Sequence, residues 1–280
     1  MDQASIDTIS QQLEKRIAMK ALALPMLPQV TTQVLSLVND VNSDAAELAK
    51  LIQSDQALAG HVMRIANSAA YSPNAKMTSL QQAIARLGMQ NMSEIAMAAT
   101  MGPKMFNTKG YEELVKGIWI SSLATAVWAR EIARQGRRNV ESTFLCGLLF
   151  QIGRPVVLQT VLDIAKDDDM DIEQEVVAQL MERYQAQVGS ELADHWLLPS
   201  AVKDTILGIA GQGSGASADI VATVKAARTF AACTTADRQY DEAALSADAT
   251  IVDINLYADD VQQLLEKSDS VHDTISELSL

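Results

Sequence analysis

The sequence predicts an all-α protein, and two features of the chain carry that prediction. Apolar residues make up 48% of its 280 residues, which is enough for a sizeable core, yet only 4% are aromatic. Ala, Leu, Met and Gln are abundant instead, and such side chains lose little conformational freedom in a helix. Apolar positions recur at helical spacing, and no stretch alternates between apolar and polar residues as a half-buried strand would.

The first expected helices follow one another with short breaks. The prolines within residues 24–28 separate the first helix from the second, and Pro28 suits a first helical turn because its missing N–H is not needed there. Asp44 with Glu47 has the spacing of a capping box, which begins a helix. The expected apolar faces are Ile6, Ile9 and Leu13; Val30, Val34, Leu37 and Val38; Leu48, Leu51 and Ile52; and Leu58, Val62, Ile65 and Ala69.

Further cap signals divide the rest of the first hundred residues. Thr78 with Gln81 has the spacing of a second capping box. Gly88 is placed to end that helix, since glycine adopts the left-handed conformation of a C-terminal cap without strain. Asn91 with Glu94 is expected to open the next helix.

The second half shows the same helical pattern. Trp119 and Trp128 mark a long buried helix, and a second buried helix at 145–158 is interrupted by Gly153 and Pro155. The tryptophans are interpreted as core residues. The remaining signals are a cap at Asp171 and Gln174, an apolar stripe of Val202, Ile206 and Ile209, a linker at Gly211-Gln212-Gly213-Ser214-Gly215, and helices through 221–233 and 259–265.

The net charge of −13 is unevenly distributed. Residues 161–280 hold 23 acidic and 7 basic side chains, whereas residues 101–160 hold 4 acidic and 8 basic ones. An acidic chain repels phosphate backbones, so we expect no nucleic-acid partner. The one basic cluster, Arg134, Arg137 and Arg138, is interpreted as a solvated helix end, where cations are favourable.

The compartment is predicted from what the sequence lacks. Cys146 and Cys233 are in no metal-like spacing, and buried, reduced thiols are the expected state. The N-terminus has neither the basic start nor the apolar run of a signal peptide. No uninterrupted apolar stretch is expected to span a bilayer. The chain is therefore predicted to be cytoplasmic and free of membrane contact.

Ordered motifs recur in both halves of the chain. The first set is L-P-M-L-P at 24–28, D-Q-A-L at 55–58, R-I-A-N-S-A at 64–69 with Asn67 and Ser68, and T-S-L-Q-Q-A-I-A-R-L-G at 78–88, ending at Gly88. The second is W-I-S-S-L at 119–123, G-L-L-F-Q-I-G from Gly147 to Gly153, V-G-S-E-L at 188–192, and Trp196-Leu197-Leu198-Pro199. Together, over about residues 22–210, they resemble the HDOD family, the HD-related output domain of bacterial signalling proteins.

The resemblance implies a domain organisation and a class of function. We expect an N-terminal helix at 1–21, an HDOD domain at 22–210 and a C-terminal helical segment at 211–280. The domain would consist of an N-terminal helical layer at 22–110 packed on a degenerate HD-like helical bundle at 111–210. Such modules have no established catalytic activity and serve signalling and regulation.

The resemblance also identifies places where HD phosphohydrolases bind metal. The usual G-L-L-H-D-I-G-K reads here with Phe150 and Gln151 in place of His and Asp, and with Arg154 at the end. Ser121 stands where a family histidine precedes a serine, and Gln185 stands where a later one is found. A phenyl ring has no lone pair for a cation, and neutral amide or hydroxyl oxygens are weak ligands. These positions are therefore predicted to be vestigial, with no metal and no cofactor.

Other candidate ligands receive structural interpretations. His61 is expected to lie on a helix surface or to be half-buried, and His272 is expected in the polar C-terminal tail. His195 follows Asp194, and adjacent residues on a helix point about 100° apart, so they cannot chelate one ion unaided. The run Asp167, Asp168, Asp169 and Asp171 lacks the central glycine of a calcium loop and is interpreted as a solvated cap for the next helix. Asn67 and Ser68 are interpreted as a helix cap rather than a partner contact.

The sequence thus predicts a non-catalytic bacterial signalling or regulatory module. It would act through a protein partner, and a small molecule or nucleotide could occupy a vestigial cleft near Trp119, Ser121, Ser122, Phe150, Gln151 and Arg154. Two alternatives remain: a metal-dependent phosphohydrolase with atypical ligands, and a nucleotide-binding sensor without turnover. Phosphatase turnover with manganese or magnesium would favour the first, and ligand-dependent stabilisation would favour the second.

Overall fold

The computed structural model describes residues 3–40, 42–68, 71, 76–213, 215–235 and 240–279. Ala69 and Ser214, and the side chain of Val38, lie outside the described part. Within it the chain is helical without any strand, which confirms the predicted all-α fold. The helices are α1 (Gln3–Ala18), α2 (Gln29–Asn39), α3 (Ala45–Gln53), α4 (Gln56–Ala66), α5 (Leu80–Leu87), α6 (Met89–Thr100), the 3-10 turn η1 (Pro103–Met105), α7 (Glu112–Gln135), α8 (Val140–Leu149), α9 (Gly153–Asp167), α10 (Gln174–His195), α11 (Ser200–Ile209), α12 (Ala218–Thr235), α13 (Glu242–Ala247), α14 (Ala249–Val252), α15 (Ala258–Leu265) and α16 (Ser268–Leu278).

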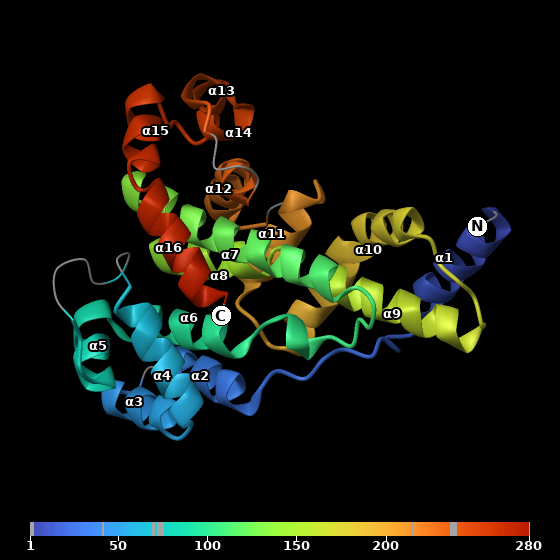
Figure 1. The fold of residues 1–280 in the computed structure, drawn as a ribbon, viewed down its shortest axis with the longest axis horizontal. Helices are drawn as coiled ribbons and strands as arrows, with labels where there is room; N and C mark the ends of the chain where they lie inside the picture. The colour runs from blue at the N-terminus through green and yellow to red at the C-terminus, as the bar shows by residue number, and fades with distance from the viewer. Residues whose placement is uncertain are drawn as a thin grey trace.

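Helix α7 is the central element of the molecule (Figure 1). It packs against α8, α12 and α16, while α9 and α10 form a closely packed pair beside it. Helices α2 to α6 form an N-terminal layer, which meets the bundle where α6 packs on α8. Helix α1 lies at the opposite end, against α9 and α10. There the Ser10 and Tyr184 hydroxyls are 2.6 Å apart, and Tyr184 donates to Glu14 at 2.6 Å.

The cap signals were correct for some helices and wrong for others. The Asp44 carboxylate accepts from the backbone N–H of Ala46 and Glu47 and begins α3 as predicted. Helix α5, however, begins at Ser79, whose hydroxyl accepts from the backbone N–H of Gln82. The expected Thr78 box is therefore off by one residue.

Two further predicted helix starts are also wrong. Helix α6 begins directly after Gly88 rather than at Asn91. Gly88, with a φ of 86°, is both the residue that ends α5 and the residue that precedes α6. Helix α10 begins after Glu173, so Asp171 is not its cap.

The break predicted within 145–158 lies a few residues earlier than expected. Helix α8 ends at Leu149, and Gly153 and Pro155 fall in the first turn of α9. Gly147 is required because an added Cβ would lie 2.8 Å from Ala126 Cα on α7. At Gly153 the same atom would lie 2.1 Å from the Gln185 carbonyl oxygen on α10. Both glycines therefore permit close helix crossings, which explains why the stretch keeps them.

Polar residues of the sequence motifs connect loops to helices through hydrogen bonds. The Asn67 amide donates to the carbonyls of Met63 and Met77 and accepts from the Met77 N–H. It therefore ends α4 and ties the chain on both sides of residues 69–75, and this geometry supports the structural interpretation. Ser68 beside it is buried. The Trp196 indole donates to the Pro25 carbonyl at 2.9 Å, and Pro199 precedes the first residue of α11.

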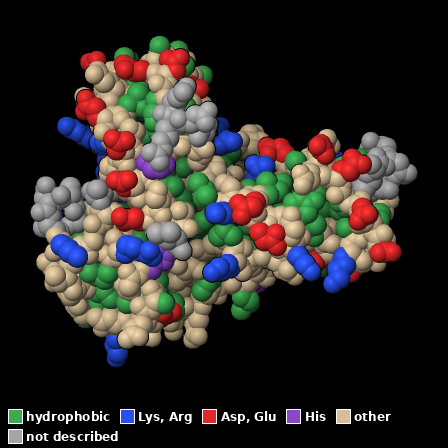
Figure 2. Space-filling model, in the orientation of Figure 1, with side chains coloured by type: hydrophobic (Ala, Val, Ile, Leu, Met, Phe, Trp, Pro, Cys, Tyr) green, Lys and Arg blue, Asp and Glu red, His purple; other side chains and the backbone are tan. Residues whose placement is uncertain are grey.

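The C-terminal segment is packed into the bundle. Helix α12 contacts α7, α8 and α11, and the Trp128 indole donates to Thr234 at 2.7 Å. Arg138 donates to the Ile254 carbonyl at 2.8 Å, so the basic cluster is not merely a solvated helix end as predicted. Figure 2 shows acidic side chains both over the region where α13 to α15 lie in Figure 1 and over the arm that contains α1, α9 and α10.

One stretch corrects the expectation about apolar length. Residues Ser142–Asp167 are long and apolar enough to cross a membrane by length and composition. In the structure 83% of the most apolar window is buried inside the protein, and the stretch bends between α8 and α9. This is the pattern of core helices, which pass the same test as a membrane span.

Candidate functional site

The cleft between α7, α9 and α12 brings together most of the positions that the sequence predicts to be vestigial. Ser121 comes from α7, Phe150 and Gln151 come from the turn between α8 and α9, and Arg154 comes from the first turn of α9. All four line a cleft of about 710 Å³. Gln185 on α10 lines a smaller recess of about 60 Å³ that shares Phe150, Gln151 and Arg154 with the cleft.

Two residues expected in this cleft lie elsewhere. Ser122 is buried behind Gln151 and does not line the cleft. Trp119 lines a separate cavity of about 820 Å³ between α7, the turn η1 and the end of α16. The separation follows from helix geometry, since Trp119 and Ser121 point about 200° apart around α7. Two residues of one motif, two positions apart in the sequence, therefore line two different cavities.

Gln151 is held in a purely structural geometry. Its side-chain nitrogen donates to the Ile118 carbonyl and to the Ser122 hydroxyl, each at 3.0 Å, and the residue is only 5% exposed. The amide therefore donates a hydrogen bond to each of two acceptors on α7. An ionised carboxylate has no hydrogen to donate and could not make these bonds. Gln151 acts here as a bridge between the α8–α9 turn and α7.

Phe150 forms an apolar wall of the cleft. The residue is 6% exposed, and the Arg228 guanidinium carbon lies 5.3 Å from the centroid of its ring. This is within the range of a cation–π contact. Because Arg228 belongs to α12, the C-terminal segment completes the cleft that the bundle begins.

Among the described residues, the charged side chains that line the cleft are all cationic: Arg154, Lys225 and Arg228. The remaining polar lining includes the hydroxyls of Ser121, Thr125, Thr229, Thr235 and Thr250 and the thiol of Cys233. Sequence reasoning missed Lys225 and Arg228 because they lie beyond the recognised motifs. A signal was present, since they are two of only seven basic residues in the acidic 161–280 segment.

One acidic residue stands at the rim. Glu182 on α10 lies 3.8 Å from Arg154, but its side chain is 69% exposed. Such an exposed, long ion pair contributes little. Loss of hydration within the cleft lowers the pKa of Arg228; Glu182 opposes that shift and Arg154 adds to it. Arg154 and Arg228 therefore repel each other across a site where one weakly held carboxylate is the nearest compensation.

The donors at the vestigial positions do not fit a divalent cation. Ser121, Phe150, Gln151 and Gln185 offer a hydroxyl, a phenyl ring and two neutral amides, without imidazole or carboxylate. The amide nitrogen of Gln151 is already committed to α7. Throughout the described ranges, no three His, Cys, Asp or Glu side chains are grouped so that they could hold a metal ion.

The other candidate ligands also have structural surroundings. His61 is half-buried, and its pKa is lowered by burial and by Arg64, against a hydrogen bond to the Glu277 backbone on α16. His195 is exposed at the end of α10, and His272 lies on α16. Asp167 pairs with Arg16 at 3.0 Å, and Asp168 accepts from Gln12 at 2.5 Å. These exposed aspartates contact α1 and do not cap α10, which corrects the predicted cap.

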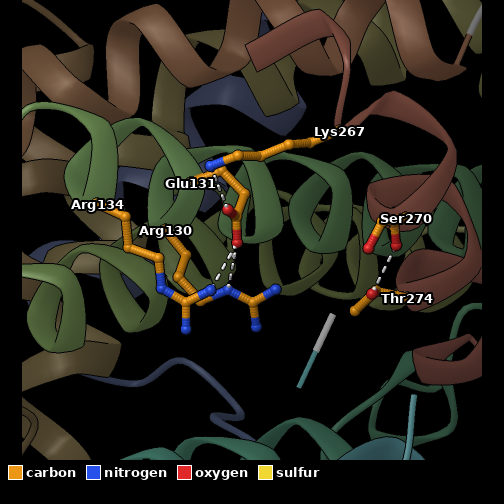
Figure 3. A network of polar contacts seen from close by, with 6 residues as sticks. All are labelled: Arg130, Glu131, Arg134, Lys267, Ser270 and Thr274. Carbon is orange, nitrogen blue, oxygen red and sulfur yellow. Dashed lines mark hydrogen bonds and ion pairs between the residues drawn. The ribbon is translucent and has the colours of Figure 1, made fainter. Parts of the chain in front are cut away.

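A second polar cluster on α7 differs from the cleft in having its own carboxylate (Figure 3). Glu131 accepts from Arg130 at 3.3 Å, Arg134 at 2.9 Å and Lys267 at 3.2 Å, and its side chain is only 9% exposed. Burial raises the pKa of Glu131, but the three cations outweigh burial and lower it. Arg130 is fully buried, and its guanidinium stacks 4.3 Å from the Tyr71 ring centroid.

Comparison with known proteins agrees with the motifs. The HDOD domain family matches residues 24–209. An uncharacterized protein of Treponema pallidum (strain Nichols) is 22% identical over 209 residues, which are 72% of this chain and 40% of that protein. The match thus covers about 40% of the length of that relative.

Solved structures share the fold across the chain. A Shewanella amazonensis protein, provisionally named a metal-dependent phosphohydrolase, has a TM-score of 0.77 at 20% identity and covers 98% of this chain and 99% of its own. An HDOD domain protein of unknown function from Geobacter sulfurreducens has a TM-score of 0.70 at 22% identity, covering 99% of both chains. A Marinobacter aquaeolei protein, provisionally named for signal transduction, has a TM-score of 0.63 at 19% identity, covering 99% of this chain and 66% of its own.

Proposed function

Because the chain belongs to the HDOD family, we propose that it is a regulatory signalling module that works by binding rather than by hydrolysis. The observation that carries the proposal is the geometry of Gln151. Its amide occupies the place of a family metal ligand and is bonded on both hydrogens to α7. Hydrolysis of phosphate esters by an HD site needs cations to activate water, and these residues supply no strong ligand for them.

The names of structural neighbours point to two different roles. One is provisionally a metal-dependent phosphohydrolase and one a signal transduction protein. Identities of 19–20% carry the fold alone, so the choice rests on this chain's own residues. Phe150 puts an apolar ring at a position where the family resemblance implies a metal ligand. That supports the regulatory role, in which a protein partner would respond to the state of the module.

Metal analysis and a hydrolysis assay test the proposal together. The purified protein is dialysed against manganese or magnesium, analysed for bound metal, and assayed on p-nitrophenyl phosphate and bis-p-nitrophenyl phosphate. We expect far less than one ion per chain and no chelator-sensitive turnover. One tightly bound ion per chain, with turnover abolished by chelation, would refute the proposal.

A variant with restored ligands provides the matched control. Ser121→His, Phe150→His and Gln151→Asp together return imidazole and carboxylate donors to the cleft. If the frame is HD-like, the triple variant should bind manganese measurably, whereas the Phe150→His, Gln151→Asp pair alone should bind less. Calorimetric titration of the three proteins gives the comparison, and equal binding by all three would contradict the proposed frame.

A further inference from the structure

We infer that the cleft between α7, α9 and α12 binds a phosphorylated small molecule, held by Arg154, Lys225 and Arg228. The inference rests on the proposed function, because the ligand is bound without being hydrolysed. It adds the chemical class of that ligand. Lys225 and Arg228 lie outside the residues matched to the family. The site would therefore join the HDOD bundle to this chain's C-terminal segment.

Charge is the first argument. The chain carries a net charge of −13, yet Arg154, Lys225 and Arg228 are the charged residues that line the cleft. Lys225 and Arg228 are three residues apart on α12, so they share one face of the helix. Arg154 meets them from α9. Three cations gathered on an acidic protein create a local field that attracts a multivalent anion.

Incomplete pairing is the second argument. Within the described residues, neither Lys225 nor Arg228 has an acidic side chain within 4.0 Å, and Arg154 has only the exposed Glu182 at 3.8 Å. The Arg154 Nε atom is buried and has no hydrogen-bond partner in the part of the chain that the structure describes. Guanidinium groups form strong, directional bonds to phosphate oxygens. A phosphate group would supply the acceptors that the cleft lacks.

Size and lining restrict the ligand further. A volume of about 710 Å³ exceeds what one inorganic phosphate needs and lies in the usual range for small-molecule sites. The Phe150 ring provides an apolar wall, and Ser121 and Thr229 provide hydroxyls near the cations. The cleft thus suits a molecule with one or more phosphates and an organic part that packs against Phe150.

Binding is tested with pyrophosphate and adenosine triphosphate as probes. Thermal unfolding is followed at constant ionic strength against a sodium chloride control, and dissociation constants are measured by calorimetry. We expect a saturable rise in melting temperature, because a ligand that binds only the folded protein stabilises it. The phosphate-bearing probes should bind, whereas adenosine alone should not. Absence of binding by both phosphorylated probes would overturn the inference.

Three variants locate the site. Arg228→Gln removes a charge-assisted bond and should weaken binding about tenfold to a hundredfold. Glu182→Gln removes the competing carboxylate and should tighten binding a few-fold. Lys50→Gln makes the same charge change at an exposed position on α3 and should leave binding unchanged. Equal weakening by Arg228→Gln and Lys50→Gln would show nonspecific attraction and would contradict a built site.

The native thiols provide an independent readout. Cys233 lines the cleft, whereas Cys146 is buried, and burial raises the pKa of the Cys146 thiol to about 12. Alkylation should therefore occur at Cys233 and slow when pyrophosphate or adenosine triphosphate is present, with Cys146 unreacted. Mass spectrometry of the two peptides measures both rates. Unchanged alkylation of Cys233 at saturating probe would place the ligand elsewhere.

The outcomes separate this inference from the proposed function. Metal-dependent turnover together with probe binding lost in Arg228→Gln would refute only the non-catalytic role. Lack of turnover together with lack of probe binding would refute only the phosphorylated ligand.

Discussion

Helix α7 borders two groups of basic side chains that differ in their supply of carboxylate. Around Glu131, the side chains of Arg130, Arg134 and Lys267 all reach one buried acid (Figure 3). In the cleft, the described part of the chain offers Arg154, Lys225 and Arg228 one ion pair, between Arg154 and the exposed Glu182 at the rim. In the first group a buried carboxylate balances the cations, although both terminal nitrogens of Arg130 lack a hydrogen-bond partner among the described residues. In the second group no buried carboxylate among the described residues balances the cations, which leaves their charge available to an anionic ligand.

This difference distinguishes cations that stabilise the fold from cations that are available to bind a ligand. A buried ion pair need not stabilise a protein relative to apolar residues, but breaking one is costly because the remaining charge stays buried. The fully buried Arg130 is in that position. The cations of the cleft keep contact with solvent, so their incomplete pairing is tolerable in the free protein.

Glu131→Gln should have the largest effect on stability. It leaves Arg130 buried without its counter-charge, and we expect a loss of about 3–5 kcal/mol in the free energy of unfolding, as for other broken buried pairs. Urea denaturation measures the loss. Glu182→Gln is the matched control at the exposed rim and should change stability by about 0.5 kcal/mol or less. Similar losses in the two variants would remove the distinction between the groups.

The pH dependence of stability should reveal the same carboxylate. The pKa of Glu131 is lowered in the folded protein, so folding favours its ionised form. Its contribution is present above its unfolded pKa of about 4.3 and is lost as the pH falls through the lower folded value. The stability difference between wild type and Glu131→Gln should therefore narrow below about pH 4.3. A difference that stays constant from pH 7 to pH 3 would exclude Glu131 as the titrating group.

Much of the fold could be predicted from the sequence, because helical spacing and glycine positions are local signals. Asp44 and Gly88 begin and end helices as expected, whereas α5 begins at Ser79 because neighbouring hydroxyls compete for the same cap. The candidate cleft was only partly predicted. Ser121, Phe150, Gln151 and Arg154 share it, but Arg228 joins from a helix far along the chain. That approach depends on tertiary packing, and no spacing in the sequence encodes it.

Lys267→Met should have a smaller effect than loss of Glu131. Lys267 approaches Glu131 from the start of α16 at 3.2 Å, but its side chain is 39% exposed. Partly exposed pairs contribute about 1 kcal/mol or less. We expect a loss of that size together with faster amide hydrogen exchange in α16, since the bond ties this helix to α7. If exchange quickens equally in α3, which Lys267 does not contact, the effect is global and this role for Lys267 is wrong.

Arg228→Gln should have the smallest effect on the free protein. The substitution loses the contact with the Phe150 ring but also removes the repulsion between Arg154 and Arg228. The two changes oppose each other, so we expect a change of about 0.5 kcal/mol or less in phosphate-free buffer. In saturating pyrophosphate the variant should become clearly less stable than wild type, because the ligand stabilises mainly the wild type. Urea denaturation in both buffers tests this, and a loss of the same size in each would make Arg228 a structural residue like Arg130.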